Sequence, residues 1–208
     1  MPARHDPTGS PSRPRLRARC VSVLGLLGGL LVASGCAATP DPEPAVYGAP
    51  EILAALQPGD IAVPPLQNLT GHPSIPIEGM RASFSRALVE RLYSPLDAEY
   101  VDGNWVEASF RGTPAPDAVL VISILRWDEN KLFEDGTIAA AAELVLFQGG
   151  STTGNLLWGR SVDLTIDMKD GRAAAPGPSP NLIPDATLAF AREALSTLPE
   201  RDPVAAHP

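Results

Sequence analysis

The clearest pattern in the chain is a helical spacing of apolar residues between positions 77 and 93. Five apolar residues recur there every three or four positions: Ile77, Met80, Phe84, Leu88 and Leu92. Charged and small polar residues occupy the positions between them, so the segment predicts an amphipathic α-helix. Pro76 suits the first turn of such a helix, and Ser94-Pro95 ends it.

A second pattern predicts strands. The run over 117–127, DAVLVISILRW, is almost unbroken in its apolar character and rich in Val and Ile, which is typical of a strand buried on both faces at the centre of a sheet. The segments 137–147 and 156–167 are predicted as two further strands, joined by the glycine-rich loop QGGSTTGN. Shorter strands are predicted at 61–63 and 98–101.

The end of the chain predicts one more helix, over 185–198, with Asp185 as its N-cap. The segment 171–184 before it reads as a linker of Ala, Gly and Pro, and residues 199–208 are predicted to be a disordered tail. The element order β-α-β-(α)-β-β-β-α predicts an α+β fold, in which a mixed sheet of about four or five strands is packed in two layers by two helices.

The N-terminal region carries the three parts of an export signal. Residues 1–19 hold five arginines and one acid, an apolar run follows at 21–32, and small residues precede Cys36. The stretch Ala33-Ser34-Gly35-Cys36 resembles the lipobox of bacterial lipoproteins, whose cysteine is acylated and becomes the new N-terminus. The resemblance implies a signal peptide over 1–35 and a palmitate-type anchor on Cys36.

Two alternatives for this region stay open. Residues 20–40 contain no charge and would span about 30 Å as a helix, so an uncleaved transmembrane anchor is one, and an ordinary cleaved signal is the other. Ala37 follows Cys36 where an aspartate would mark retention, and by the sorting rule of enteric bacteria this implies the outer membrane, facing the periplasm.

The segment after the anchor predicts a spacer. Residues 39–50, TPDPEPAVYGAP, hold four prolines and two acids, which is typical of an extended, semi-rigid segment. Residues 36–57 are therefore predicted to be the lipid anchor and a Pro-rich tether, with one or two helical turns over 51–56 that end at Pro58-Gly59-Asp60. The α+β domain is predicted over 58–198.

Charge narrows the class of partner. The chain has 16 basic and 24 acidic residues, a net charge of −8; removal of 1–35 takes away five arginines and one aspartate and leaves −12. Nucleic acid is excluded as a partner, because phosphate binding requires clustered cations. Cys36 would be the only cysteine of the mature chain, so the folded domain is expected to stand without a disulfide.

Candidate chemistry is sparse. The sequence lacks the HExxH, GxSxG, SxxK, Walker and GxGxxG motifs. After removal of the signal peptide only His72 and His207 remain, so no metal site and no cofactor are predicted. The acidic stretch DENKLFEDG at 128–136 departs from the calcium-loop pattern and is predicted to be a solvated turn. We therefore do not expect an enzyme.

Two stretches carry a family resemblance. The phrase DIAVPPLQNLTG over 60–71 precedes the long helix, and over 143–158 a strand, a Thr-Gly turn and an aliphatic-Trp strand follow one another. In this order they resemble envelope lipoproteins with a TolB N-terminal-like domain, which include activators of penicillin-binding proteins and the curli-secretion lipoproteins. The resemblance implies a similar fold over 60–167.

These observations predict a non-catalytic, lipid-anchored adaptor that binds another periplasmic or membrane protein. Its partner surface is expected on the loop after the first strand and around a surface tryptophan: Leu66, Asn68, His72 and Trp105. Trp127 and Trp158 are expected in the core. Two alternatives stay open, a structural subunit of a secretion or transport assembly, including a homo-oligomer, and an envelope hydrolase with His72 as a general base.

Overall fold

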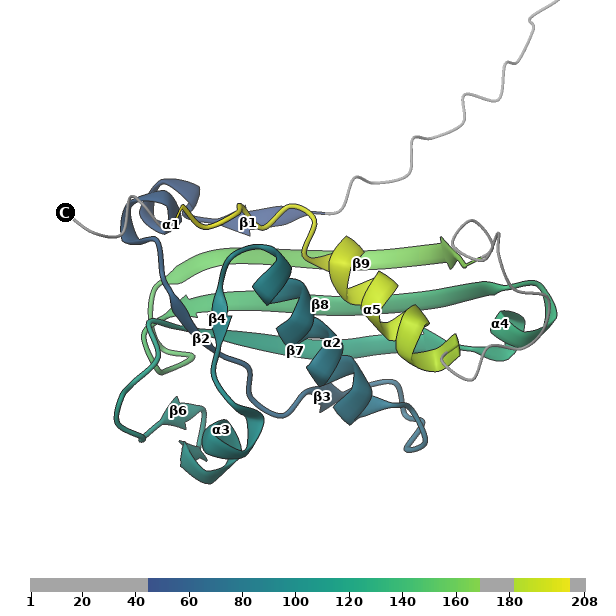
Figure 1. Cartoon of the computed structure of the whole chain (residues 1–208), viewed down its shortest axis with the longest axis horizontal. Coiled ribbons are helices and arrows are strands. Elements are labelled where there is room, and N and C mark those ends of the chain that lie inside the picture. Colours follow the sequence, from purple (N-terminus) through teal and green to yellow (C-terminus); the bar gives the residue numbers. More distant parts are fainter. Residues whose placement is uncertain (1–44, 169–181, 203–208) are drawn as a thin grey trace, which may run out of the picture. The chain divides into compact units, whose positions relative to one another are not determined.

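The computed structural model describes residues 45–168 and 182–202 (Figure 1). The predicted signal peptide, the acylated Cys36 and most of the predicted tether lie outside these residues, as does His207. Within them a seven-stranded mixed sheet has the order β1-β9-β8-β7-β2-β4, with β3 pairing to β7 beside β2. Its strands are β1 Val46–Gly48, β2 Asp60–Ala62, β3 Gln67–Asn68, β4 Ser94–Pro95, β7 Ala118–Asp128, β8 Thr137–Gln148 and β9 Leu156–Asp167.

Five helices accompany the sheet in the described residues. They are α1 Pro50–Leu56, α2 Ile77–Glu90, α3 Ala98–Asn104, α4 Asn130–Glu134 and α5 Leu182–Ala194. A separate two-stranded hairpin is formed by β5 Trp105–Val106 and β6 Ser109–Phe110. The α+β class is confirmed, and the sheet has more strands than predicted because four of them are only two or three residues long.

The main core lies between one face of the sheet and the pair α2 and α5, which lie side by side across the long strands (Figure 1). The ring of Phe84 on α2 packs edge-on against Phe190 on α5, with 5.9 Å between the ring centres. Phe190 in turn contacts Trp127 of β7 at 6.1 Å. These three aromatic side chains join both helices to the central strand, and Trp127 is buried as predicted.

Among the described residues, the opposite face of the sheet is covered at one end by a small second cluster. Ala62 and Val119 point away from the main core and form a small second cluster with Val101 of α3, against which Trp105 and Phe110 pack. Successive strand residues point to opposite faces, which is why β2 and the first half of β7 are buried on both sides. The prediction of a central, doubly buried strand is thus confirmed for this half of β7.

A buried arginine ties the end of α5 to the sheet. Arg160 of β9 is 3% exposed, and its Nη1 donates to the carbonyl oxygens of Glu193 and Ala194 and to the Ser196 hydroxyl. A cation at a helix C-terminus meets carbonyls that lack partners within the helix and the negative end of the helix dipole. Burial lowers the pKa of Arg160, and the nearby carboxylate of Glu193 opposes that shift.

The folded part begins earlier than the predicted tether allowed. Val46–Gly48, within the segment predicted to be a spacer, pairs antiparallel with β9. Pro50–Leu56 forms the helical turns that were predicted over 51–56. The ring of Tyr47 lies directly over Gly159, where a Cβ atom would come within 2.3 Å of it, and its hydroxyl donates to Glu143. This contact, which local composition cannot predict, fixes β1 against the sheet edge.

Two short segments also differ from their predictions. Residues 98–101 form part of helix α3 and not a strand, because the Asp97 side chain accepts the N–H groups of Glu99 and Tyr100 as an N-cap. The acidic turn expected at 128–136 contains the single-turn helix α4, whose Leu132 is buried.

The ends of the last helix differ as well. Helix α5 starts at Leu182 and not at Asp185, with Asp185 in its first turn. The tail predicted to be disordered from 199 is ordered through 202, because the Tyr93 hydroxyl donates to the Pro199 carbonyl and Arg201 donates to the Gln57 carbonyl.

The two covering helices are also joined by an exposed ion pair that should make stability depend on pH. Arg192 of α5 donates through Nε and Nη2 to the two carboxylate oxygens of Glu90 on α2, at 2.7 and 2.6 Å. These hydrogen bonds lower the pKa of Glu90 below its ordinary value of 4.5. The unfolded chain therefore binds this proton more readily, so the pair stabilises the fold above the unfolded pKa and loses its effect as pH falls through the folded pKa.

We expect Glu90→Gln to lower the melting temperature near pH 7 by more than it does near pH 3, because the stabilising effect of the pair is lost as the pH falls through the pKa of folded Glu90. Thermal unfolding followed by circular dichroism at a series of pH values measures the difference. Glu99→Gln, at an exposed carboxylate on α3, is the matched control and should show no such trend. A Glu90→Gln effect that is equal at both pH values would contradict this role of the pair.

Candidate functional site

The loop between β3 and α2 is ordered by its own side chains. Asn68 Oδ1 accepts the N–H and the hydroxyl of Thr70, and Asn68 Nδ2 donates to the carbonyl of His72 at 2.8 Å. The N–H of His72 donates back to the Thr70 hydroxyl at 3.0 Å. Short polar side chains that bond the backbone two to four residues on hold a turn in one conformation. The loop therefore has a defined shape without any partner.

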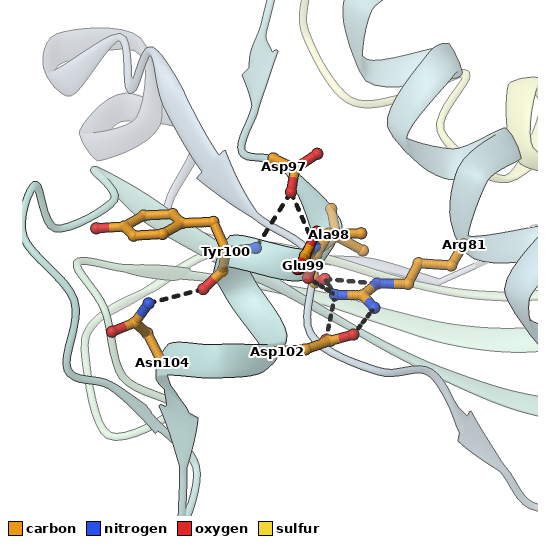
Figure 2. A network of polar contacts seen from close by, with 8 residues as sticks. Arg81, Asp97, Ala98, Glu99, Tyr100, Asp102 and Asn104 are labelled. Carbon is orange, nitrogen blue, oxygen red and sulfur yellow. Dashed lines mark hydrogen bonds and ion pairs between the residues drawn. The ribbon is translucent and has the colours of Figure 1, made fainter.

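Arg81 of α2 fixes the chain on either side of this loop. Its side chain is 4% exposed, and its Nε and Nη2 both donate to the carbonyl of Val63, at 3.0 and 2.7 Å. Nη1 and Nη2 also contact the two carboxylate oxygens of Asp102 on α3, at 2.9 and 2.7 Å (Figure 2). The guanidinium of α2 thus connects the segment after β2 with helix α3. Its planar group of N–H donors can contact both acceptors at once, which the single ammonium group of lysine cannot do in the same way.

A cleft of about 410 Å³ lies between this loop and the last residues of β7. It is lined by Thr70, His72, Ser74, Ile75, Leu125, Arg126, Trp127, Asp128, Glu129 and Asn130. One wall is therefore the loop, and the other is the strand end with the residues that lead into α4. The ordered loop and the central strand make this a preformed cleft.

Two carboxylates give the strand-side wall its negative charge. Asp128 Oδ1 accepts the backbone N–H and the side-chain amide of Asn130, and Glu129 Oε2 accepts Trp127 Nε1–H at 3.2 Å. The one arginine in the lining, Arg126, forms an ion pair with Asp163 of β9. The charge of Arg126 is thereby already balanced outside the cleft.

Apolar side chains are exposed around the same cleft. Leu125 in its wall is 42% exposed, and Leu69, whose N–H donates to the carbonyl of Ile124, is 60% exposed. Phe133 on α4, a few residues beyond the strand end, is 65% exposed. Large apolar side chains that cluster at an ordered surface and are rimmed by charge are typical of protein-binding sites.

The structure divides the predicted partner surface. His72 is exposed and lines the cleft, and Asn68 is exposed on β3, where its side chain shapes the loop. Leu66 is wrong as a surface residue: it is 7% exposed, and its side chain packs in the main core. Its apolar side chain is buried beneath the loop, whereas the polar residues after it face solvent.

Trp105 does not belong to the same surface. It is half-buried beside Val119 at the start of β7, whereas the cleft lies at Asp128 near the end of that strand. Nine residues of strand separate the two positions by about 30 Å. The two parts of the predicted contact surface, the loop and Trp105, thus lie toward opposite ends of the same strand.

Sequence reasoning missed Leu125 because it lies inside the most apolar run of the chain. Leu125 follows Ile124 of the main core and therefore points to the other face of the sheet, which is exposed at this end of β7. The neighbouring acidic residues Asp128 and Glu129 belong to the stretch predicted to be a solvated turn. Its position beside the loop at 70–75 depends on the pairing of β3 with β7.

Neither a metal-binding group nor a membrane-spanning helix is found among the described residues. No group of three or more His, Cys, Asp or Glu side chains in these ranges is placed to hold a metal ion. Among the same residues, no helix is both long and apolar enough to cross a bilayer.

Comparison with known proteins gives resemblances in structure only. No protein-family model matches the chain, and no curated protein matches it significantly. A PelC dodecamer structure from Paraburkholderia phytofirmans is 15% identical over 76% of this chain and 98% of its own, with a TM-score of 0.49. The lipoprotein GNA1162 from Neisseria meningitidis is 19% identical over 67% of this chain and 100% of its own, with a TM-score of 0.43.

The solved structures of similar arrangement thus include a lipoprotein. At these identities and TM-scores no family and no activity follows for this chain. Neither of the two proteins is described as TolB-like, so the resemblance to that domain stays a prediction.

We expect Arg81→Ala to lower the free energy of unfolding by about 3 kcal/mol, because it leaves the buried carbonyl of Val63 without its donor and removes the partner of Asp102. Arg81→Lys should lose part of this stability, since an ammonium group cannot contact both acceptors with the same fork. Urea unfolding followed by far-UV circular dichroism measures both values.

Arg86→Ala is the matched control for this measurement. Arg86 lies on the same helix, its side chain is 67% exposed, and its Nε lies 3.7 Å from a carboxylate oxygen of Glu90, one turn along the helix. Its removal should change the free energy of unfolding by no more than about 0.5 kcal/mol. If Arg81→Ala proves as mild as Arg86→Ala, the guanidinium does not hold these elements together.

Proposed function

We propose that this protein is a lipid-anchored, non-catalytic adaptor of the bacterial cell envelope, which binds another envelope protein through the cleft at the end of β7. The observation that carries the proposal is this cleft, where exposed apolar side chains surround a preformed opening with an acidic wall. The lipobox-like sequence before Cys36 supports the anchoring.

The anchor would keep the domain at one membrane. A single acyl chain binds a bilayer only marginally, and two or more make the attachment stable, at about 0.8 kcal/mol per buried CH₂. With Ala37 after the cysteine, we place the protein at the outer membrane, facing the periplasm. Confinement near the surface raises the effective concentration of any partner held there, so a weak contact suffices.

The cleft is suited to a protein partner because its walls need little ordering on binding. The Asn68 and Thr70 hydrogen bonds hold the loop, and the Arg81 contacts hold the chain on either side of it. A preorganised surface avoids part of the entropy that binding otherwise costs. Exposed Leu69 and Leu125 supply apolar area that a partner would remove from water.

We assign no catalytic role to His72. A general base is normally oriented by a third group that bonds its second nitrogen. In the described residues the hydrogen bonds of His72 come from its backbone carbonyl and N–H, which shape the loop. Binding is therefore the role that we infer for this side of the cleft.

We expect Cys36→Ser to release the mature protein from the membrane fraction. The change removes the thiol that would carry the acyl chains, so the chain should lose both its lipid mass and its sedimentation with membranes. Cell fractionation with mass spectrometry of the N-terminal peptide measures this. Cys20→Ser, within the predicted signal peptide, is the control and should behave as wild type. An unmodified thiol on Cys36 in membrane-bound wild-type protein would overturn the anchoring.

We expect a photo-crosslinking amino acid at position 72 to capture one envelope protein in intact cells, because that side chain lines the cleft. The double variant Leu69→Asp and Leu125→Asp should reduce this cross-link at least tenfold, since it places two charges on the apolar rim. Mass spectrometry identifies the captured protein, and immunoblotting measures the yield.

The control is the double variant Val89→Asp and Leu56→Asp, which adds the same charge at exposed apolar positions on α2 and α1. Equal melting temperatures of both double variants would show that folding is unaffected. If both double variants retain the cross-link, the partner does not use the cleft.

A further inference from the structure

The strand-side wall of the cleft is a free edge of the sheet. On this side β7 pairs with β2 at Ala118 and Val119 and with β3 at Ser123 and Ile124, and the last bond runs from the N–H of Leu69 to the carbonyl of Ile124. In the described part of the chain, the residues of β7 after Ile124 pair only with β8, on the other side. The edge of the central strand is therefore open for about 10 Å.

Trp127 presents its backbone groups to this edge. In an antiparallel sheet, successive residues of a strand direct their backbone N–H and carbonyl to opposite sides. The N–H of Ser161 donates to the carbonyl of Ala45, on the side of β9 away from β8. The backbone groups of Val162 therefore bond to Ala142 of β8, so the N–H and carbonyl of Ala142 face β9. Ala140, two residues away, faces β9 as well. Trp127 stands opposite Ala140 and therefore directs its N–H and carbonyl away from β8, toward the cleft.

The β-bulge produces this arrangement. The carbonyl of Ile124 points to β3, and without the bulge the next residue to point that way would be Arg126. The extra residue at Leu125 moves this position to Trp127. In the described residues neither backbone group of Trp127 bonds to the loop that forms the opposite wall.

We propose that the cleft binds an extended peptide segment of the partner as an added strand, hydrogen-bonded to the backbone N–H and carbonyl of Trp127. This inference rests on the proposed function, because it names the partner's chemistry at the same site. Addition of a strand to a free sheet edge satisfies backbone groups that would otherwise face water, and side-chain pockets select the sequence.

Charge complementarity determines the kind of segment. The carboxylates of Asp128 and Glu129 line the wall, and the only arginine there is paired with Asp163. Leu69 and Leu125 offer apolar contacts on the same rim. The occupant is therefore a short segment of three or four residues in which Lys or Arg alternates with an aliphatic residue.

The probe is the peptide acetyl-Lys-Val-Lys-Val-Lys-amide, added to the mature protein in mild detergent and followed by fluorescence polarisation. Two analogues test strand addition directly, one N-methylated at both valines and one N-methylated at the central lysine. In an added strand only alternate N–H groups face β7. One analogue should bind at least tenfold more weakly than the parent peptide, and the other should bind within threefold of it.

Hydrogen exchange gives a second readout that side-chain docking would not produce. The amide of Trp127 should exchange at least tenfold more slowly with the peptide bound. Equal binding of both methylated analogues, or unchanged exchange at Trp127, would overturn strand addition.

The charge requirement is tested with Asp128→Asn combined with Glu129→Gln. Both amides keep an oxygen that can accept from Asn130 and from Trp127 Nε1, so the wall keeps its shape. We expect at least fivefold weaker binding of the basic peptide. The matched control, Glu99→Gln with Glu107→Gln, removes two exposed carboxylates at the other end of the sheet and should bind as wild type. Equal affinity of the two double variants would overturn the basic character of the segment.

The outcomes separate this inference from the proposed function. If cross-linking from position 72 identifies an envelope partner while the methylated peptides bind alike, the adaptor function stands and strand addition fails. If the peptides show alternate-position dependence and no envelope protein is captured, strand addition stands and the adaptor function fails.

Discussion

The buried guanidinium of Arg81 is the contact on which the geometry of the candidate site depends. It bonds the carbonyl of Val63, just after β2, and the carboxylate of Asp102 on α3, from a helix whose first residue follows the cleft loop. A buried charge is costly unless hydrogen bonds surround it, so its acceptors and its helix can hardly move apart. The loop between Val63 and α2 therefore starts and ends at fixed points.

The binding properties proposed for this loop depend on its position beside the end of β7. Its own Asn68 and Thr70 contacts give it a defined shape, and the pairing of β3 with β7 sets it beside the end of the central strand. There Leu125 lies on the exposed face of the sheet, and the bulge beside it directs the backbone groups of Trp127 to the open edge. One irregularity in the ladder thus gives the cleft its hydrogen-bonding edge beside an apolar side chain.

The rest of the domain supplies rigidity. The side chains of Phe84, Phe190 and Trp127 join α2, α5 and β7 in a single core, so the strand that forms the cleft wall is anchored from its buried face. Arg160 holds the end of α5 from the neighbouring strand β9. A rigid scaffold with a functional loop and strand end at its edge is a common arrangement in binding proteins.

The sequence by itself determined the elements whose periodicity is local. The helical spacing of apolar residues predicted α2 within a few residues. The Val- and Ile-rich run and the two segments after it predicted β7, β8 and β9. These predictions are possible because the order of apolar and polar residues depends on whether one face or both faces of an element are buried. Tertiary structure decided the site. The burial of Leu66, the outward backbone groups of Trp127 and the separation of Trp105 from His72 follow from strand pairing between segments far apart in the chain. A local pattern carries no information on the partner, register or bulge of a strand.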